Sequence, residues 1–152
     1  MSKSIISVQN LCVSYITKGS PIDAVKGISF DIKKGEIFGL VGESGSGKST
    51  VVQALLRTLP PPGIISGGHA YFNEKDIFES TYDQVISFRW KEISIVLQSA
   101  LNALNPVLKI RDQIKDVLEI HTDSSEDDID KRINELLLLV DIDATRLDSY
   151  PH

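Results

Sequence analysis

Residues 42–49 read Gly42-Glu43-Ser44-Gly45-Ser46-Gly47-Lys48-Ser49 and fit the phosphate-loop pattern G-x-x-x-x-G-K-[ST]. The apolar run Ile37 to Val41 precedes this loop, and a helical pattern from Thr50 to Leu59 follows it. The alternative is a Gly/Ser-rich turn that precedes a helix by chance. Here, however, the strand, the loop, the lysine, the hydroxyl and the helix follow one another at the spacing that the pattern requires. The stretch therefore predicts a nucleoside triphosphate site in an α/β fold.

Each residue type in this loop suits the binding of phosphate. Glycines allow the loop to fold back on itself with its N–H groups pointing inward. We expect those N–H groups, the helix N-terminus and the ammonium of Lys48 to surround the β- and γ-phosphates. The hydroxyl of Ser49 is expected to ligate Mg²⁺, and Thr50 is included among the predicted nucleotide contacts. The loop therefore predicts a bound nucleoside triphosphate with Mg²⁺, and by itself it does not choose between ATP and GTP.

The overall composition narrows the class of protein. The chain has 152 residues, 16 basic and 21 acidic, and a formal charge of −5, whereas a general nucleic-acid binder is usually basic. With 41% hydrophobic and 24% charged residues, it is typical of a globular protein. No apolar run approaches the roughly 20 residues that span a bilayer, and no signal peptide is evident, so we expect a cytoplasmic location. The single cysteine, Cys12, is predicted to be a buried small hydrophobe.

Charge and periodicity both change near Ile110. Residues 1–110 hold 11 basic and 9 acidic side chains, and residues 111–152 hold 5 and 12. Before the change, two helical stretches, 48–59 and 82–90, interrupt short β-rich runs, and the Gly67-Gly68 pair is predicted to be a turn. These runs are Ile5 to Ile16, Ile28 to Ile32, Glu36 to Val41, His69 to Phe72 and Glu92 to Leu97. We predict a core module of residues 1–109 and a helical module of residues 110–152.

The helical module shows apolar residues at a period of 3.6. They are Ile110, Ile114, Val117 and Leu118, then Ile129, Ile133, Leu136, Leu137 and Val140. Ser124 and Ser125, followed by three acidic residues, predict an N-cap and a first turn favoured by the helix dipole.

The flank of the loop, Val25 to Val41, resembles the nucleotide-binding domain of ATP-binding-cassette (ABC) transporters, and with the loop this likeness runs over about 25 residues. The resemblance implies that the cofactor is ATP with Mg²⁺ and that Tyr15 stacks on the adenine, although an ordinary strand aromatic is the alternative for Tyr15. It also implies that Ile93 to Gln98 is the strand that leads into the Q-loop. Gln98, 50 residues after Lys48, would then contact Mg²⁺ and the attacking water, so Lys48 and Gln98 are the predicted catalytic residues and Ser49 and Gln98 the predicted metal ligands.

A longer stretch, Gln98 to Pro106 and on to Ile114, is similar to ATP-binding subunits of oligopeptide and dipeptide importers, although many of these have Asp or Gly where this chain has Ser99. In that family the region faces the membrane permease. Leu101, Leu104 and Pro106 would therefore dock on the transmembrane permease subunits, or else pack the loop onto its own helices. A second ATP-binding subunit is the other implied partner, and the implied location is the cytoplasmic face of the membrane.

The resemblance implies motifs that these 152 residues do not contain: the signature L-S-G-G-Q, the Walker B strand with its carboxylates, the D-loop and the switch histidine. The run Leu136 to Asp141 has the apolar residues followed by Asp that are typical of Walker B, but the spacing of its apolar residues is helical. His152 is not the switch histidine, because it precedes the position of the signature. We therefore expect an incomplete sheet, aggregation through exposed strands, and nucleotide binding without hydrolysis. The chain would be the N-terminal part of a subunit, either truncated or completed by a second chain.

The predicted fold class is thus α/β: a P-loop NTPase core of ABC type with an N-terminal antiparallel β region and a partial α-helical subdomain. A non-catalytic nucleotide-binding or interaction module is the first alternative. A P-loop kinase or GTPase is less favoured, because Asn73 to Asp76 misplaces the lysine of N-K-x-D and D-x-x-G is missing.

Overall fold

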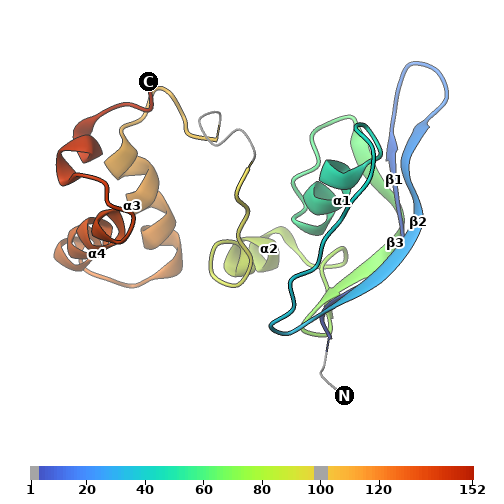
Figure 1. The fold of residues 1–152 in the computed structure, drawn as a ribbon, viewed down its shortest axis with the longest axis horizontal. Coiled ribbons are helices and arrows are strands. Elements are labelled where there is room, and N and C mark those ends of the chain that lie inside the picture. The colour runs from blue at the N-terminus through green and yellow to red at the C-terminus, as the bar shows by residue number, and fades with distance from the viewer. Residues whose placement is uncertain (1–3, 98–102) are drawn as a thin grey trace. The chain divides into compact units, whose positions relative to one another are not determined.

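The computed structural model describes residues 4–97 and 103–152, which form two compact units, Met1–Ile86 and Ser87–His152 (Figure 1). The first unit holds a sheet and the helix that follows the phosphate loop, and the second holds the helices near the C-terminus. The predicted α/β class is confirmed. The predicted module boundary near Ile110 falls inside the second unit and stays a prediction.

The sheet of the first unit has four antiparallel strands in the order β2-β1-β3-β4. They are β1 (Ser4–Tyr15), β2 (Ile22–Lys33), β3 (Gly63–Phe72) and β4 (Lys75–Asp76). Side chains alternate between the two faces, and one face supplies the core, where Val8 lies opposite Ala70 and both are buried. Helix α1 (Lys48–Leu55) lies beside this sheet and buries Val51 and Ala54 (Figure 1). The predicted antiparallel β region is confirmed.

Two glycines predicted to form a turn lie inside β3. Gly67 and Gly68 sit where the register between β1 and β3 shifts, which marks a bulge. Gly68 has φ +83°, and a Cβ there would stand 2.3 Å from the carbonyl oxygen of Asn10. The pair therefore permits a close approach of two strands, and the turn prediction was wrong.

Two predicted strands are not formed. Residues 36–41 have no strand partner in the part of the chain that the structure describes, and residues 92–97 contribute only a single bridge between Arg89 and Ile93. The side chain of Ile37 is 100% exposed and that of Val41 is 93% exposed. A parallel strand is stable only when neighbours hydrogen-bond to it and cover its faces. No described residues supply such neighbours, so the apolar sequence alone does not make a strand.

Cys12 is also placed differently from the prediction. It is half-buried, and its thiol lies 3.5 Å from the carbonyl oxygen of Asn10. The irregular register on both sides of Leu11 and Cys12 breaks the simple alternation of faces, and for this reason an apolar neighbourhood in the sequence did not bury it.

The second unit is built from α3 (Ile110–His121), α4 (Glu126–Leu139) and the 3-10 helix η2 (Ala144–Asp148), while α2 (Tyr82–Phe88) spans the boundary between the units. Ile129, Ile133, Leu137 and Leu147 form its core, with Ile110, Ile114 and Leu118 packed against them. Ser125 caps α4 by accepting the N–H of Asp128 at 3.3 Å. The helical period and the N-cap at Ser125 were predicted correctly, but Val140 follows the last residue of α4 and is 63% exposed, so it does not belong to the buried face. Leu136 to Leu139 lie in α4, which excludes a Walker B strand there.

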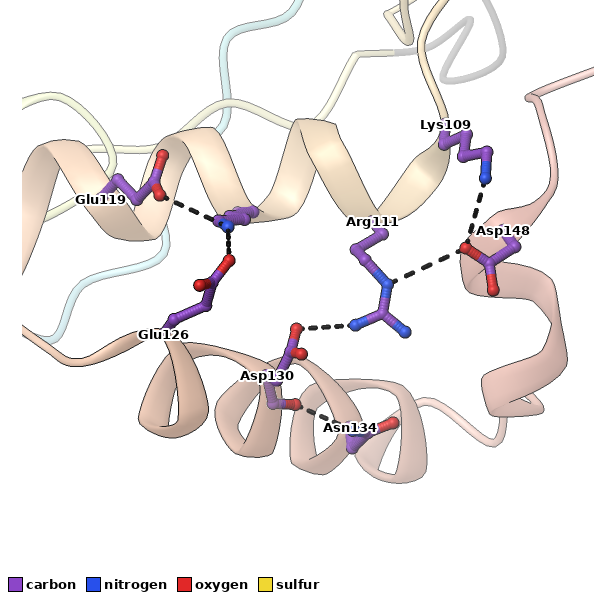
Figure 2. A network of polar contacts seen from close by, with 8 residues as sticks. Lys109, Arg111, Glu119, Glu126, Asp130, Asn134 and Asp148 are labelled. Atoms are coloured by element: carbon purple, nitrogen blue, oxygen red, sulfur yellow. Dashed lines mark hydrogen bonds and ion pairs between the residues drawn. The ribbon is translucent and has the colours of Figure 1, made fainter.

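Ion pairs on the surface join the three helices of this unit (Figure 2). The guanidinium of Arg111 lies 2.6 Å from Asp130 of α4 and 4.0 Å from Asp148 of η2. Lys115 contacts Glu126 at 2.5 Å, and this hydrogen bond raises the pKa of the lysine. Exposed pairs of this kind each contribute about 0–1 kcal/mol. The apolar core of this unit therefore supplies most of its stability.

Candidate nucleotide-binding site

The phosphate loop turns sharply into α1, whose first residue is Lys48. Gly45 and Gly47 both have left-handed backbones, with φ +80° and +89°, which glycine adopts without steric cost. The N–H of Val51 donates to the carbonyl of Gly47 at 2.9 Å, which starts the helix. A Cβ on Gly47 would stand 2.6 Å from the carbonyl oxygen of Ala24 in β2. The sheet therefore fixes the position of the loop.

The ammonium of Lys48 is held by the loop itself. Its Nζ donates to the carbonyl oxygen of Gly42 at 2.8 Å, to that of Glu43, and to the hydroxyl of Ser46 at 3.3 Å. These are neutral acceptors, and a phosphate oxygen is a stronger, charged one. The loop thus holds a cation close to the N-terminus of α1, where an anion is favoured.

Ser49 is exposed on the first turn of α1. Within residues 4–97 and 103–152 its hydroxyl has no hydrogen-bond partner. An unengaged hydroxyl next to the loop is a suitable oxygen ligand for Mg²⁺, so the residues present fit the predicted cofactor.

Tyr15 ends β1 beside the first turn of α1. Its hydroxyl oxygen lies 3.4 Å from Oγ1 of Thr50, and a Cβ on Gly63 would stand 3.0 Å from the ring. The structure therefore places Tyr15 next to one of the predicted nucleotide contacts, although 35 residues separate Tyr15 from Thr50 in the chain. Its role in stacking on adenine stays a prediction.

A polar cluster that the sequence analysis missed supports this end of the sheet. Ser14 is 5% exposed, and its hydroxyl oxygen lies 2.8 Å from Oδ1 of Asp23 and 2.9 Å from Oγ of Ser66. These bonds join β1 to β2 and β3 directly before Tyr15. The only signal in the sequence was a serine at an inward position of an apolar strand.

A hollow of about 320 Å³ adjoins the loop on the side of β2. It is lined by Val25, Lys26, Leu40, Ser46, Lys48 and Val51, among others. This volume is at the lower end of the range typical of ligand sites. Tyr15 does not line this hollow, so the hollow and the predicted adenine contact lie at different places beside the loop.

Gln98 and Leu101 lie outside the described residues, so the predicted catalytic and docking roles of these two residues stay predictions. Leu104 is 38% exposed and Pro106 is also exposed. The amide of Gln113 bonds the N–H and carbonyl of Asn105 at 2.8 and 3.1 Å. The backbone of Asn105 is thus fixed to α3, while the side chains of Leu104 and Pro106 are exposed.

Comparison with known proteins gives one family and several similar transport proteins. Residues 25–152 match the family described as ABC transporter. The dipeptide transport ATP-binding protein DppD of Bacillus subtilis is 39% identical over an alignment of 153 positions, which covers 99% of this chain and 46% of that protein. The oligopeptide transport ATP-binding protein OppD of the same organism is 37% identical over 151 residues, covering 97% and 42%. The chain therefore spans less than half the length of these relatives.

A similar solved structure is the ATP-binding cassette MJ0796, described as a dimeric post-hydrolysis state bound to ADP and Pi. The match has a TM-score of 0.80 at 24% identity and covers 96% of this chain and 61% of the other. At this identity the likeness establishes the fold.

Proposed function

The chain belongs to the ABC transporter family, and from this premise we propose that it is the nucleotide-binding part of an ATP-binding subunit that powers the uptake of oligopeptides or dipeptides. The observation that carries the proposal is the position of the Lys48 ammonium, which the loop holds at the N-terminus of α1. Family membership removes the P-loop kinase and GTPase alternatives. The names of the relatives supply the class of solute.

In this proposal the residues of the loop have separate roles in binding ATP. The loop N–H groups and Lys48 bind the β- and γ-phosphates, and the hydroxyl of Ser49 holds Mg²⁺, which compensates phosphate charge when bound. Gln98 is the proposed second contact to the metal and to the attacking water. Tyr15 provides a flat surface for adenine.

The proposed partners are the membrane permease, through residues 101–106, and a second ATP-binding subunit. In the described residues, no helix has both the length and the apolar character needed to cross a membrane. We propose a peripheral position on the cytoplasmic face of the membrane, reached through the permease. Fixation of the 105–108 backbone by Gln113 supports a surface that is ordered before docking.

Replacing Tyr15 with alanine should weaken ATP binding by about 1–3 kcal/mol, because stacking of a base on an aromatic ring contributes energy of this size. Tyr15→Phe keeps the ring and loses only the contact with Thr50, so its affinity should stay close to that of the parent chain. Since stacking does not read base edges, GTP should bind nearly as well as ATP. Calorimetric titration with both nucleotides measures these differences. Equal affinities of Tyr15→Ala and Tyr15→Phe would contradict the stacking role, and a strong preference for guanine would contradict the proposed ATP site.

The 152-residue chain should bind ATP without turning it over. Its loop supplies phosphate and metal contacts, whereas hydrolysis also requires a group that orients or deprotonates water, and no such carboxylate is identified in these residues. Phosphate release from monodisperse protein is the measurement, with Lys48→Ala as the control for a contaminating ATPase. Turnover that this control abolishes would refute binding without hydrolysis.

A further inference from the structure

We propose that His69, Asp76 and Glu79 form a binding site for a divalent transition-metal ion of the Zn²⁺ type. One donor atom from each side chain lies within 4.8 Å of the other two. An imidazole and two carboxylates are a donor set that such ions accept. None of the three residues belongs to the phosphate loop, so this site is separate from the Mg²⁺ that accompanies ATP.

The sheet places the site on its open face. His69 precedes Ala70 in β3, and because side chains alternate along a strand, the imidazole points away from the buried face that contains Ala70. The imidazole is 51% exposed and stacks on Tyr71, with ring centroids 6.0 Å apart. An ion can therefore reach the ring from solvent.

Asp76 is already fixed in a ligand orientation. Its side chain is 9% exposed, its Oδ1 accepts the N–H of Phe78 at 2.8 Å, and its Oδ2 lies 2.6 Å from Nδ1 of His69. Metal–ligand distances of 2.0–2.2 Å would set a nitrogen and an oxygen on one tetrahedral ion about 3.3 Å apart. The pair needs to open by about 0.7 Å to admit the ion. The neutral imidazole then offers the lone pair of Nδ1 to the ion and carries its single proton on Nε2.

Glu79 is available as the third ligand. Within the described residues it makes no hydrogen bond or ion pair. The segment that carries it is nevertheless ordered, because Arg57 Nη1 donates to the carbonyls of Phe78 at 3.3 Å and Ser80 at 2.6 Å. The hydroxyl of Ser80 also donates to the carbonyl of Asp76 at 2.7 Å. An ordered backbone with an unengaged carboxylate lowers the entropic cost of closing on an ion.

The test is a titration of the full chain with Co²⁺ in the absence of nucleotide and Mg²⁺. Visible absorption measures the binding of Co²⁺, and added Zn²⁺ should displace it. We expect one ion per chain. His69→Gln and Glu79→Gln should each weaken binding by at least about tenfold, the lower end of the loss known even for outer-shell partners of metal ligands. His152→Gln removes an exposed histidine outside the cluster and should leave the affinity unchanged.

Glu79 is exposed, so its variant tests the site without disturbing the fold, and circular dichroism verifies each protein. Retention of the Co²⁺ spectrum in His69→Gln would overturn the proposal. Unchanged affinity in Glu79→Gln would overturn it as well, as would a parent chain that binds no ion at millimolar Co²⁺. In the last case, the contact between His69 and Asp76 is a simple ion pair or hydrogen bond.

Discussion

Lys48→Ala should lower the affinity of the chain for ATP by at least about 100-fold, since hydrogen bonds to charged groups contribute about 1.5–3 kcal/mol each and this ammonium is expected to make more than one. It is the cation that the loop holds at the N-terminus of α1. Calorimetry on the folded variant measures the loss.

Lys34→Ala provides the matched control, because Lys34 is an exposed lysine in the turn after β2. It removes the same charge outside the loop, so its affinity for ATP should equal that of the parent chain. The ammonium of Lys48 also bonds the loop carbonyls, so thermal unfolding must accompany the titration. ATP binding that survives Lys48→Ala in a folded sample would disprove the proposed site.

Gly47→Ala should abolish measurable ATP binding, because two obstacles act at once. The residue has φ +89°, and a Cβ would stand 2.6 Å from the carbonyl oxygen of Ala24. A left-handed backbone costs a residue with a Cβ about 1–2 kcal/mol. The contact with β2 adds a displacement of the loop or of the strand, and either movement shifts the N–H groups predicted to bind phosphate.

Two other glycines of the same region separate these effects. Gly45 has φ +80° but open space around its Cβ position, whereas Gly39 has neither a left-handed φ nor a close neighbour. Gly45→Ala should therefore lower the melting temperature by about 2–8 °C, and Gly39→Ala should change neither stability nor affinity. A Gly47→Ala variant as stable and as active in binding as Gly39→Ala would show that the loop is not fixed by β2.

Much of this architecture could be predicted from local signals. Helix α1 begins at Lys48 because the loop pattern includes its own helix start, and α4 begins after Ser125 because a serine followed by acidic residues is a local capping signal. The period of 3.6 placed Ile129, Ile133 and Leu137 on one buried face. These features depend on residues within a few positions of one another, and a single sequence contains that information.

Features that depend on distant partners could not be predicted in this way. The run Ile37 to Val41 has the composition of a buried strand, yet it is not a strand, because strand formation depends on neighbours that the run itself does not specify. Gly67 and Gly68 have the composition of a turn, yet they form a bulge because β1 passes close to them.

The sequence by itself therefore determined the phosphate loop, the helices and the family to which the chain belongs, since all three follow from residue order over short spans. Only the tertiary structure decided that Tyr15 meets Thr50, that Ala24 confines Gly47, and that His69 meets Asp76. The physical reason is that strand pairing and register bring these residues together, and pairing is a property of two segments at once.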